Sequence, residues 1–506
     1  MAGAQYRQMR TLDAWPQVDP LTARASSTPD RTAVIESETG RTWTYEELFD
    51  DADWLAGRIA AVCEGRPDRL GIAMETGIDF VRATHAAWRL GTAIVPLDTR
   101  EPAETLEFLA EKAAVDAVVA TDRTAGAIAD IEGPPLFTVD ETDVAGVESL
   151  PAYDGGTTPR ARYPSDTHLI MFTSGTTGEP RGVKLTLTNL FASAIASAFR
   201  LGLTREDRWL VSVPMVHMGG LAPLIRSTLY GTSVVLQREF EPAETATTMI
   251  DFDVTGVSFV PTMLSRLLDT EWSPPESLRF VLLGGAAAPR DLIERSEDAG
   301  VPAFPTYGMT ETASQVATAT PTQAFGNPGT VGQPLMFTKV AIIDDEASAA
   351  PGETGEIVID GPTVTPGYLD DAETRKVFDE RGLHTGDLGY RDADGRLYVV
   401  GRIDDQIVTG GENVDPGEVE SVIESHPAVA ESVVVGISDE EWGERVGALV
   451  VPENGSDPDV DGIETACRDE LAAFKVPKSI AVAESIPRTV SGTVDRDGVI
   501  ERIRQA

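Results

Sequence analysis

The sequence predicts an α/β protein, because short apolar runs with strand character alternate with amphipathic runs of helical length. Residues 42–120 show this alternation, and residues 188–283 show it a second time. Strands that alternate with helices are typical of a parallel sheet covered by helices. The chain has 506 residues, which leaves room for roughly two to four domains and a large core. We therefore expect a large N-terminal domain, residues 1–402, that contains two α/β subdomains.

The first predicted helix runs from Tyr45 to about Val62. Thr44 can cap its N-terminus, and Glu47, three residues on, can complete a capping box. Its apolar residues recur at helical spacing and predict one buried face: Leu48, Ala52, Leu55, Ile59 and Val62. The same reasoning predicts further helices at residues 78–90 and 103–113, strands at residues 70–74, 92–97 and 115–120, and a surface connection at residues 121–165, which are rich in Asp, Thr, Gly and Pro.

The second alternation predicts helices at residues 188–200, 219–230 and 242–250 and strands at residues 209–213, 232–236, 255–259 and 279–283. From about residue 329 to residue 400, short strands are separated by Gly, Asp and Pro, which predicts a small, mainly antiparallel β subdomain. Residues 403–506 predict a small α+β C-terminal domain with helices at residues 416–425 and 460–473 and strands at residues 428–435, 446–451 and 479–483.

The charge of the chain is strongly negative. Asp and Glu number 82 against 41 Lys and Arg, which gives a formal net charge of −41. The acidic residues are distributed along the chain, so they indicate neither a disordered acidic tail nor nucleic-acid binding, which requires a basic surface. A distributed carboxylate coat is typical of proteins from a salt-loaded cytoplasm, where about 1 M salt reduces the screening length to roughly 3 Å. We therefore predict a halophilic protein that loses structure in low salt.

The lack of targeting signals and the spacing of the two cysteines predict a cytoplasmic protein. No apolar run reaches the ~18 residues of a transmembrane helix, and the N-terminal residues lack the apolar stretch of a signal peptide. Cys63 and Cys467 are far apart in the sequence and indicate neither a disulfide framework nor a metal-spaced cluster. We expect no transmembrane segment, and a homodimer is compatible with the sequence.

The strongest binding signal lies in residues 168–184, HLIMFTSGTTGEPRGVK. An apolar run ends in a stretch rich in hydroxyls and glycine: Thr173, Ser174, Gly175, Thr176, Thr177 and Gly178. Glycine lets the backbone approach an anion closely, and N–H groups and hydroxyls can converge on it, so the loop suits a polyphosphate. Arg181 and Lys184 follow and add positive charge. The Gly-Lys-Ser/Thr ending of P-loop NTPases is absent, and a solvated Ser/Thr/Gly turn is the alternative.

A second motif, TYGMTE, places Tyr307, Thr310 and Glu311 close together. An aromatic ring can stack on a purine, a hydroxyl can bind a phosphoryl oxygen, and a carboxylate can hold Mg²⁺. The alternative is a tyrosine at a loop edge followed by a helix-capping Thr-Glu pair. Downstream, Asp387 ends a Thr-Gly-Asp turn, and an ionised carboxylate can accept hydrogen bonds from both hydroxyls of a diol.

Taken together, these motifs resemble those of the adenylate-forming superfamily, which includes acyl- and aryl-CoA synthetases, luciferases and the adenylation domains of peptide synthetases. TSGTTGEPRG is similar to the phosphate-binding signature of the family, except that Arg181 stands where the family usually has lysine. The Gly-Gly-Ala-Ala segment, YGMTE, TGD and GRIDD follow in family order, and the resemblance extends from about residue 30 to about residue 495. It implies an enzyme that uses ATP, Mg²⁺ and coenzyme A.

The resemblance also implies nucleotide-binding roles for individual residues. The loop from Thr173 to Gly178, together with Arg181, would bind the phosphates. The adenine would lie along Gly284, Gly285 and Ala286 and stack on Tyr307, and the ribose would be held by Asp387 and Arg402. Thr310 would bind a phosphoryl oxygen, and Glu311 would hold Mg²⁺.

The reaction implied by the resemblance has two steps. A small-molecule carboxylic acid attacks the α-phosphate of ATP, which forms an acyl-adenylate and releases pyrophosphate. A mobile C-terminal domain then rotates about a hinge at Asp404, and the thiol of coenzyme A displaces AMP. Gly410 and Gly411 would line the tunnel for the pantetheine arm, where the lack of side chains leaves room for a thin ligand.

The sequences YGMTETASQ, NPGTVGQP and TGGENVDPGEVE look most like o-succinylbenzoate–CoA ligases of menaquinone synthesis. Ser314 and Gln315 would then lie beside the acid, and the dianionic substrate predicts a cation or a helix N-terminus for its second carboxylate. His217 stands where the family places a residue that gates the acyl site. Ordinary helix-start residues and a structural histidine are the respective alternatives, and a general aryl- or medium-chain acyl-CoA synthetase is the alternative function.

One position departs from the family. Thr493 stands where the family has the lysine that bridges the substrate carboxylate and the α-phosphate, and threonine cannot supply that charge. Loss of one preorganised donor typically costs about 10²- to 10³-fold in rate. Another cation could replace the lysine (Arg488, Arg496, Lys475 or Lys478), the first step could be slower, or the chain could be a non-catalytic nucleotide-binding relative.

Overall fold

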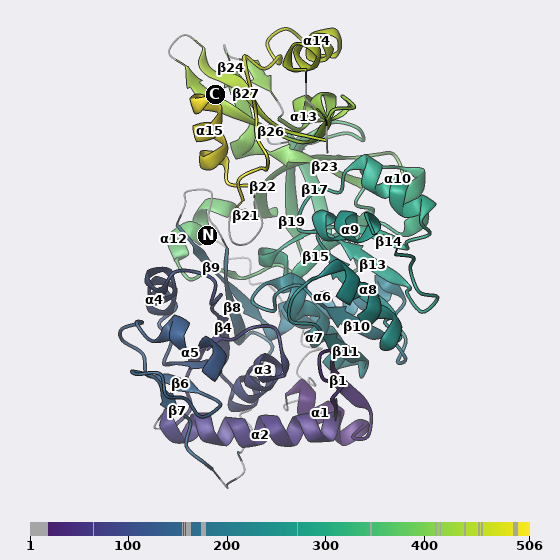
Figure 1. Cartoon of the computed structure of the whole chain (residues 1–506). Coiled ribbons are helices and arrows are strands. Elements are labelled where there is room, and N and C mark those ends of the chain that lie inside the picture. The colour runs from purple at the N-terminus through teal and green to yellow at the C-terminus, as the bar shows by residue number, and fades with distance from the viewer. Residues whose placement is uncertain are drawn as a thin grey trace, which may run out of the picture. The chain divides into compact units, whose positions relative to one another are not determined.

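The computed structural model describes residues 19–63, 65–153, 155, 157, 163–173, 179–270, 272–344, 347–409, 412–414, 416–439, 442–453, 456, 459–488 and 494–506. The chain divides into two compact units (Figure 1). One unit contains the residues up to Val340 and Ile359–Leu383, and the other contains Ala341–Val358 and His384–Ala506. No helix among these described residues is long and apolar enough to cross a membrane.

The first unit contains a sheet whose parallel core carries the predicted phosphate-binding hairpin at one end. Its strand order is β20-β9-β8-β4-β3-β5-β6-β7. The strands are β3 (Arg69–Ala73), β4 (Ala93–Pro96), β5 (Ala117–Ala120), β6 (Leu136–Thr138), β7 (Glu148–Ser149), β8 (Thr167–Thr173), β9 (Arg181–Thr186) and β20 (Gly367–Tyr368). Strands β3 to β8 pair in parallel, whereas β9 pairs antiparallel to both β8 and β20.

The second sheet of this unit has the order β16-β15-β14-β13-β12-β10-β11-β1-β2. Its strands are β1 (Thr32–Glu36), β2 (Thr42–Thr44), β10 (Arg208–Val211), β11 (Ser233–Leu236), β12 (Gly256–Phe259), β13 (Phe280–Leu283), β14 (Ala303–Met309), β15 (Ser314–Thr318) and β16 (Gln333–Pro334). The central strands pair in parallel, and β15 turns back antiparallel to β14. The parallel sheets predicted from the alternating pattern are therefore confirmed.

Helices surround these sheets, as the pattern predicts. They are α1 (Pro20–Ser27), α2 (Tyr45–Val62), α3 (Ile78–Leu90), α4 (Ala103–Lys112), α5 (Asp122–Ile128), α6 (Leu187–Leu201), α7 (Met218–Tyr230), α8 (Pro242–Asp251), α9 (Pro261–Leu268), α10 (Arg290–Asp298), α11 (Pro321–Gly326) and α12 (Asp371–Val377). The predicted capping box of α2 is present: the Glu47 backbone N–H donates to Thr44 Oγ1 at 3.1 Å, and the Thr44 N–H donates to Glu47 Oε2 at 2.8 Å. Leu48 and Ile59 on the predicted face are buried, each worth roughly 1.5–3 kcal/mol.

The expectation of a surface connection at residues 121–165 is wrong over part of its length. Helix α5 begins after Thr121, whose N–H donates to Thr124 Oγ1 at 3.1 Å. Strand β6 is buried and pairs with β5, which extends the sheet. Three buried residues between Gly/Pro-rich turns are too few to show a strand pattern in the sequence.

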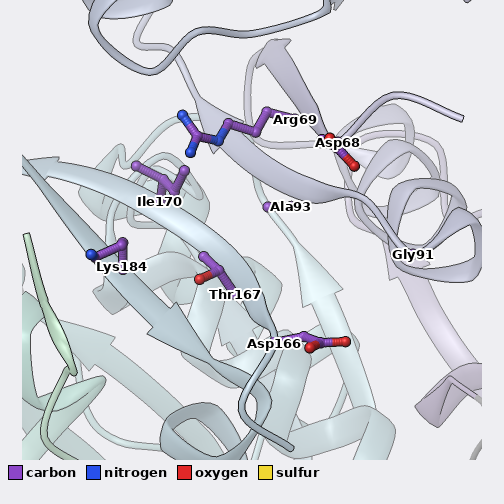
Figure 2. A pocket seen from close by; sticks show the side chains of 8 residues that line it. All are labelled: Asp68, Arg69, Gly91, Ala93, Asp166, Thr167, Ile170 and Lys184. Atoms are coloured by element: carbon purple, nitrogen blue, oxygen red, sulfur yellow. The ribbon is translucent and has the colours of Figure 1, made fainter. Parts of the chain in front are cut away.

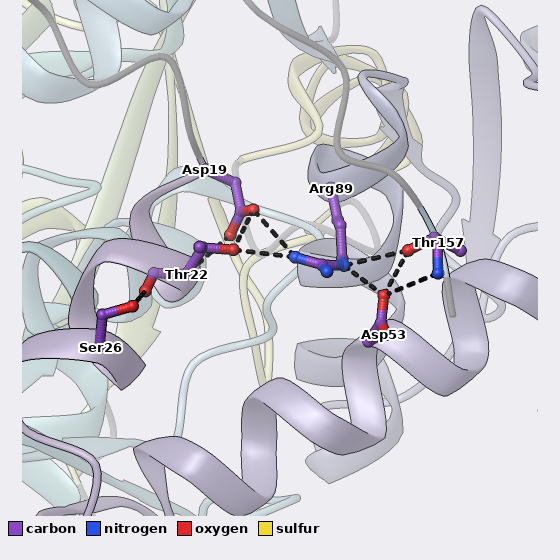
Figure 3. A network of polar contacts seen from close by, with 6 residues as sticks. All are labelled: Asp19, Thr22, Ser26, Asp53, Arg89 and Thr157. Carbon is purple, nitrogen blue, oxygen red and sulfur yellow. Dashed lines mark hydrogen bonds and ion pairs between the residues drawn. The ribbon is translucent and has the colours of Figure 1, made fainter. Parts of the chain in front are cut away.

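A buried arginine joins three helices of this unit (Figure 3). Arg89 on α3 forms an ion pair with Asp53 on α2, and its Nη1 donates to Thr22 Oγ1 on α1 at 2.9 Å. Asp19, the N-cap of α1, lies 3.6 Å from the same nitrogen, and Thr157 accepts a hydrogen bond of 3.0 Å from Arg89 Nε. These partners balance the buried charge, so the network fixes α1 and α2 against α3.

A third sheet has the order β18-β17-β19-β22-β21, in which β23 also pairs with β22. The strands are β17 (Lys339–Asp344), β18 (Ala347–Ser348), β19 (Gly355–Asp360), β21 (Phe378–Asp379), β22 (Gly382–Arg391) and β23 (Leu397–Arg402). The β17–β18, β21–β22 and β22–β23 pairs are antiparallel, as predicted.

The C-terminal residues form a further sheet with the order β25-β24-β27-β26, and β28 pairs with β27. Its elements are β24 (Ile407–Thr409), β25 (Glu412–Val414), α13 (Pro416–Glu424), β26 (Val429–Asp439), β27 (Gly443–Pro452), α14 (Val460–Glu470), β28 (Ser479–Val482) and α15 (Arg496–Gln505). Helix α15, drawn in yellow in Figure 1, was not expected from the sequence. Val499 and Ile503 bury its apolar face in the cluster that includes Val433 and Val435 of β26. The predicted domain change at residue 403 stays a prediction.

Candidate active site

The predicted phosphate-binding loop joins β8 and β9. Ser174, Gly175, Thr176, Thr177 and Gly178 lie outside the described residues. At the base of the loop, Thr173 of β8 pairs with Arg181 of β9. Arg181 Nε lies 3.1 Å from Glu373 Oε2, and its guanidinium lies 5.8 Å from the centre of the Tyr368 ring. The loop therefore has a cation at one end, and in this structure that cation is paired with a carboxylate.

The predicted adenine segment directly follows strand β13, next to the strand that carries Tyr307. Leu283 of β13 pairs in parallel with Pro305 of β14. A Cβ on Gly284 would lie 2.7 Å from Thr306 Cγ2, and Gly285 has φ +82°, so both positions favour glycine. Gly285 and Ala286 are exposed, and Tyr307 is partly exposed. The segment and Tyr307 thus lie at the carboxyl ends of adjacent parallel strands, where open α/β sheets bind ligands.

The motif from Tyr307 to Gln315 forms a tight β-hairpin. Strand β14 ends at Met309, a single 3₁₀ turn covers Thr310–Thr312, and β15 begins at Ser314. Ala313 and Ser314 have φ values of 54° and 118°, conformations that store strain and cluster at functional sites. The helix-start alternative for Ser314 and Gln315 is therefore wrong. Gln315 is buried, and its Nε2 donates to Thr318 Oγ1 at 2.7 Å.

Glu311 is a buried carboxylate within this hairpin. Its side chain accepts a hydrogen bond from the Tyr368 hydroxyl, with 2.9 Å between the phenol oxygen and Oε1. Its carbonyl accepts a hydrogen bond of 2.7 Å from the Thr365 N–H. Burial, and secondly the nearby Glu311, raise the pKa of Tyr368 above its usual value, so the phenol stays a donor. Tyr368 was not expected to lie in the site, because nothing in its neighbours distinguishes it from an ordinary strand tyrosine.

Glu311 fits the role of a Mg²⁺ ligand. Among the described residues no cluster of three His, Cys, Asp or Glu side chains could hold a metal by itself. Mg²⁺ differs from metals held in all-protein cages, because it usually binds one or two carboxylates together with the phosphates of the substrate. A single buried carboxylate near a phosphate-binding hairpin therefore suits Mg²⁺ bound to ATP.

His217 lies at the N-cap of helix α7. Its Nε2 lies 3.9 Å from Asp98 Oδ2, and Asp98 accepts a hydrogen bond of 2.8 Å from Arg100 Nε. Burial lowers the pKa of His217 below its usual value, although Asp98 acts in the opposite direction. The imidazole is therefore neutral at neutral pH and can donate or accept a hydrogen bond at the predicted acyl site.

In the second unit, Asp387 and Arg402 face each other on adjacent strands. They are directly paired between β22 and β23, and Arg402 Nη1 donates to Asp387 Oδ1 at 2.9 Å. The turn before Asp387 is fixed, because Thr385 Oγ1 donates to the Ile357 carbonyl at 2.7 Å and accepts from the Asp387 N–H at 3.0 Å. The two residues expected to bind the ribose are thus brought together.

The remaining predicted residues of this unit are only partly described. Asp404 is exposed within a single 3₁₀ turn, Ile403–Asp405, and its role as a hinge stays a prediction. Gly410, Gly411 and Thr493 lie outside the described residues. The four cations considered as replacements for the family lysine differ in their environment: Arg496 lies 2.8 Å from Asp405, Arg488 pairs with Glu431, Lys475 pairs with Glu418, and Lys478 is exposed with no ion pair among the described residues.

A pocket of about 230 Å³ lies away from these residues in the first unit (Figure 2). It is lined by Asp68, Arg69, Gly91, Ala93, Asp166, Thr167, Ile170 and Lys184. Arg69, Ala93 and Thr167 are the first residues of β3, β4 and β8, so the pocket lies at the amino ends of the parallel strands. The phosphate-binding loop follows the opposite, carboxyl end of β8.

Comparison with known proteins identifies the class that this fold and site define. Residues 21–369 match the AMP-binding enzyme family, and residues 418–493 match the AMP-binding enzyme C-terminal domain. The chain belongs to the AMP-binding enzyme family. It is an AMP-forming acid–CoA ligase with the α/β fold of that family, a large N-terminal domain and a small C-terminal domain, as the sequence predicts.

Among its relatives is a 2-succinylbenzoate–CoA ligase from Bacillus licheniformis, which is 38% identical over 481 residues, 94% of this chain and 98% of the relative. The solved o-succinylbenzoate CoA synthetase of Bacillus subtilis in complex with its acyl-adenylate intermediate is 34% identical, with a TM-score of 0.85 and coverage of 95% of this chain and 98% of that chain. The same enzyme in complex with ATP and a magnesium ion has a TM-score of 0.87 at 35% identity, with coverage of 94% and 98%.

Proposed function

We propose that the protein is a 2-succinylbenzoate–CoA ligase that uses ATP, Mg²⁺ and coenzyme A. The observation that carries this proposal is the hairpin from Tyr307 to Gln315, which combines the nucleotide-side residues with the residues expected beside the acid. Similarity to 2-succinylbenzoate–CoA ligases over nearly the whole chain supports the same substrate.

In the first step, the chain's residues bind and orient the nucleotide. Tyr307 stacks on adenine beside Gly284 and Gly285, and Thr310 donates its hydroxyl to a phosphoryl oxygen. The guanidinium of Arg181 leaves Glu373 and pairs with a phosphate of ATP, because the triphosphate carries more negative charge than one carboxylate. Bound Mg²⁺ would offset charge on the phosphates, and Glu311 would hold it. Fixed donors and cations of this kind stabilise the charge that develops as the carboxylate attacks phosphorus.

The acid is expected on the side of the hairpin that faces away from the nucleotide. His217 reaches it as a neutral imidazole, which suits a hydrogen bond to a carbonyl or a carboxylate without adding charge. Ser314 supplies a hydroxyl at the turn. The partner of a second carboxylate stays a prediction; Arg226, further along α7, is buried but donates to Ser197 Oγ at 2.9 Å and lies over the ring of Trp209.

In the second step, the thiol of coenzyme A attacks the acyl carbon. A sulfur–carbon bond forms as the thiol loses its proton to solvent, the bond between the acyl carbon and the phosphate oxygen breaks, and AMP leaves. Gly410 and Gly411 would line the path of the pantetheine arm after the C-terminal domain has rotated at Asp404. A general aryl- or medium-chain acyl-CoA synthetase would use the same steps.

A panel of acids distinguishes these substrates. The protein is incubated in molar salt with ATP, Mg²⁺, coenzyme A and either o-succinylbenzoate, benzoate or a medium-chain fatty acid, and AMP release is measured. We expect o-succinylbenzoate to be used with a specificity constant at least about tenfold above the others, because a site built for polar groups rejects analogues that leave those groups unpaired. Preference for benzoate or the fatty acid would support the general synthetase instead.

The Thr493→Lys variant tests the missing cation. We expect it to accelerate ATP–pyrophosphate exchange, by up to about 10²-fold if no other cation serves the position. The thioester-forming step, measured from preformed acyl-adenylate, serves as the control and should not change. An unchanged exchange rate would indicate that another cation already replaces the family lysine. Lys478→Ala, which removes the candidate without an ion pair among the described residues, should then slow exchange.

A further inference from the structure

A short segment of the first unit contacts both the phosphate-binding hairpin and the Glu311 turn. This segment, Thr365–Glu373, is here called the β20 clip. Gly367 and Tyr368 pair with Lys184 and Val183 of β9. Thr365 donates a hydrogen bond to each of the two elements. Its hydroxyl donates to the Lys184 carbonyl at 2.5 Å, and its N–H donates to the Glu311 carbonyl at 2.7 Å. Backbone hydrogen bonds therefore set the distance between the hairpin and Glu311.

Tyr368 is the side chain of the clip that reaches the Glu311 carboxylate. It is 4% exposed, and its hydroxyl donates to Oε1 at 2.9 Å. An ionised carboxylate has about four lone-pair sites, so one phenol bond is compatible with coordination of a cation. The bond also restricts the rotation of the Glu311 side chain, because the Tyr368 backbone is itself fixed by β9 and by a 2.9 Å hydrogen bond to Thr374 Oγ1.

The clip also contacts the cation at the base of the phosphate-binding loop. Glu373, at its end, pairs with Arg181 at 3.1 Å. The partner that the clip gives to Glu311 is a phenol, which restricts the carboxylate and adds no positive charge to it.

We propose that Tyr368 is a positioning residue that holds Glu311 in the orientation required to bind Mg²⁺ of MgATP. This inference rests on the role proposed above for Glu311 and adds a residue that acts through it. Residues that orient metal ligands by hydrogen bonds typically contribute about 10- to 100-fold to metal affinity.

The test is the Tyr368→Phe variant, which removes the hydroxyl and keeps the ring. The binding of a non-hydrolysable ATP analogue is measured by calorimetry with and without Mg²⁺, and Mg²⁺ is then titrated into the complex of protein and analogue. We expect Mg²⁺ to bind about tenfold more weakly to the variant. Binding of the analogue without Mg²⁺ should be unchanged, which a general loss of structure would not produce.

Two further variants separate positioning from stability. Tyr45→Phe is the matched control, because Tyr45 is a buried tyrosine of the same unit whose single hydroxyl proton is shared between the carbonyls of Thr232 and Ser227, at 2.7 Å and 2.9 Å. It should lower the melting temperature and leave the Mg²⁺ affinity unchanged. In a Glu311→Gln background, Tyr368→Phe should have little further effect on Mg²⁺ affinity, because the hydroxyl acts through that carboxylate.

The proposal is overturned if Tyr368→Phe lowers the melting temperature as Tyr45→Phe does but changes the Mg²⁺ affinity by less than twofold. It is also overturned if the two substitutions at positions 311 and 368 weaken Mg²⁺ binding independently. A wild-type protein whose affinity for the ATP analogue does not respond to Mg²⁺ would instead contradict the proposed role of Glu311 itself, so the two failures can be distinguished.

Discussion

Two carboxylates, one in each unit, are buried to the same extent but are held by different partners. Glu311 is 7% exposed and Asp387 is 8% exposed. Each accepts a side-chain hydrogen bond of 2.9 Å, Glu311 from the phenol of Tyr368 and Asp387 from the guanidinium of Arg402. Of these two donors, the phenol is neutral and the guanidinium is a cation. The two hydrogen bonds therefore differ in the charge of the donor and not in length.

This difference matches the two proposed tasks. A carboxylate held by a guanidinium has most of its charge offset, yet it still has lone pairs for neutral donors such as the two hydroxyls of a ribose. A phenol adds no positive charge to the carboxylate that it holds, which suits a divalent cation. The partner of a buried carboxylate can thus indicate the kind of ligand that it binds.

The largest effect is expected for Glu311→Gln. The amide keeps the shape and can still accept the hydrogen bond of Tyr368, but it has no charge for Mg²⁺. We expect ATP–pyrophosphate exchange to fall by about 10²- to 10³-fold, the loss typical for one preorganised charged group, while the melting temperature stays close to that of the wild type. If ATP–pyrophosphate exchange stays above a third of the wild-type rate, Glu311 is not the Mg²⁺ ligand and the proposed difference in task between Glu311 and Asp387 is contradicted.

A smaller effect is expected for Asp387→Asn, which weakens acceptance of the ribose hydroxyls and removes the charge that balances Arg402. A hydrogen bond to a charged group is worth about 1.5–3 kcal/mol, and the partly exposed Arg402 places the loss at the lower end, roughly tenfold in ATP affinity. Calorimetry with ATP and 2′-deoxy-ATP checks this. The wild type should discriminate against the deoxynucleotide and the variant should not; equal discrimination by both would exclude Asp387 as the ribose ligand.

The smallest effect on the site is expected from salt, which acts mainly on the protein as a whole. With a net charge of −41, self-repulsion is strong in dilute buffer and largely screened in about 1 M salt. We expect the melting temperature to rise with salt, by roughly 2–4 °C for each kcal/mol of repulsion relieved in a domain of moderate size. No rise between dilute buffer and molar KCl would contradict the prediction. The loss of ATP affinity caused by Asp387→Asn should be smaller in molar salt, whereas the loss of Mg²⁺ affinity caused by Tyr368→Phe should stay the same.

Much of the fold could be predicted from the sequence, because its signals are local. The capping box of Thr44 and Glu47 and the helical spacing after it define α2 without reference to any other part of the chain. The prediction of a surface connection at residues 121–165 is wrong where β6 forms. A three-residue strand is stabilised by its pairing with β5, so it is hardly visible in the composition of the sequence.

The site could be predicted only in part. The motifs identified the residue types at Glu311, Asp387 and Arg402, but the pairing of the last two depends on the register of β22 and β23, which local sequence does not encode. Tyr368 is separated from Glu311 by more than fifty positions and meets it only because β20 pairs with β9. Contacts that depend on sheet pairing are therefore the ones that sequence reasoning missed.

The β20 clip has a consequence for redesign. The spacing between the phosphate-binding hairpin and Glu311 is held by the pairing of β20 with β9 and by the Thr365 N–H, and none of these bonds involves a residue of the proposed acyl site. If His217 and Ser314 line that site as proposed, an engineer could vary them to admit a different acid while this spacing stays the same. The choice of substrate and the activation chemistry would then be separable.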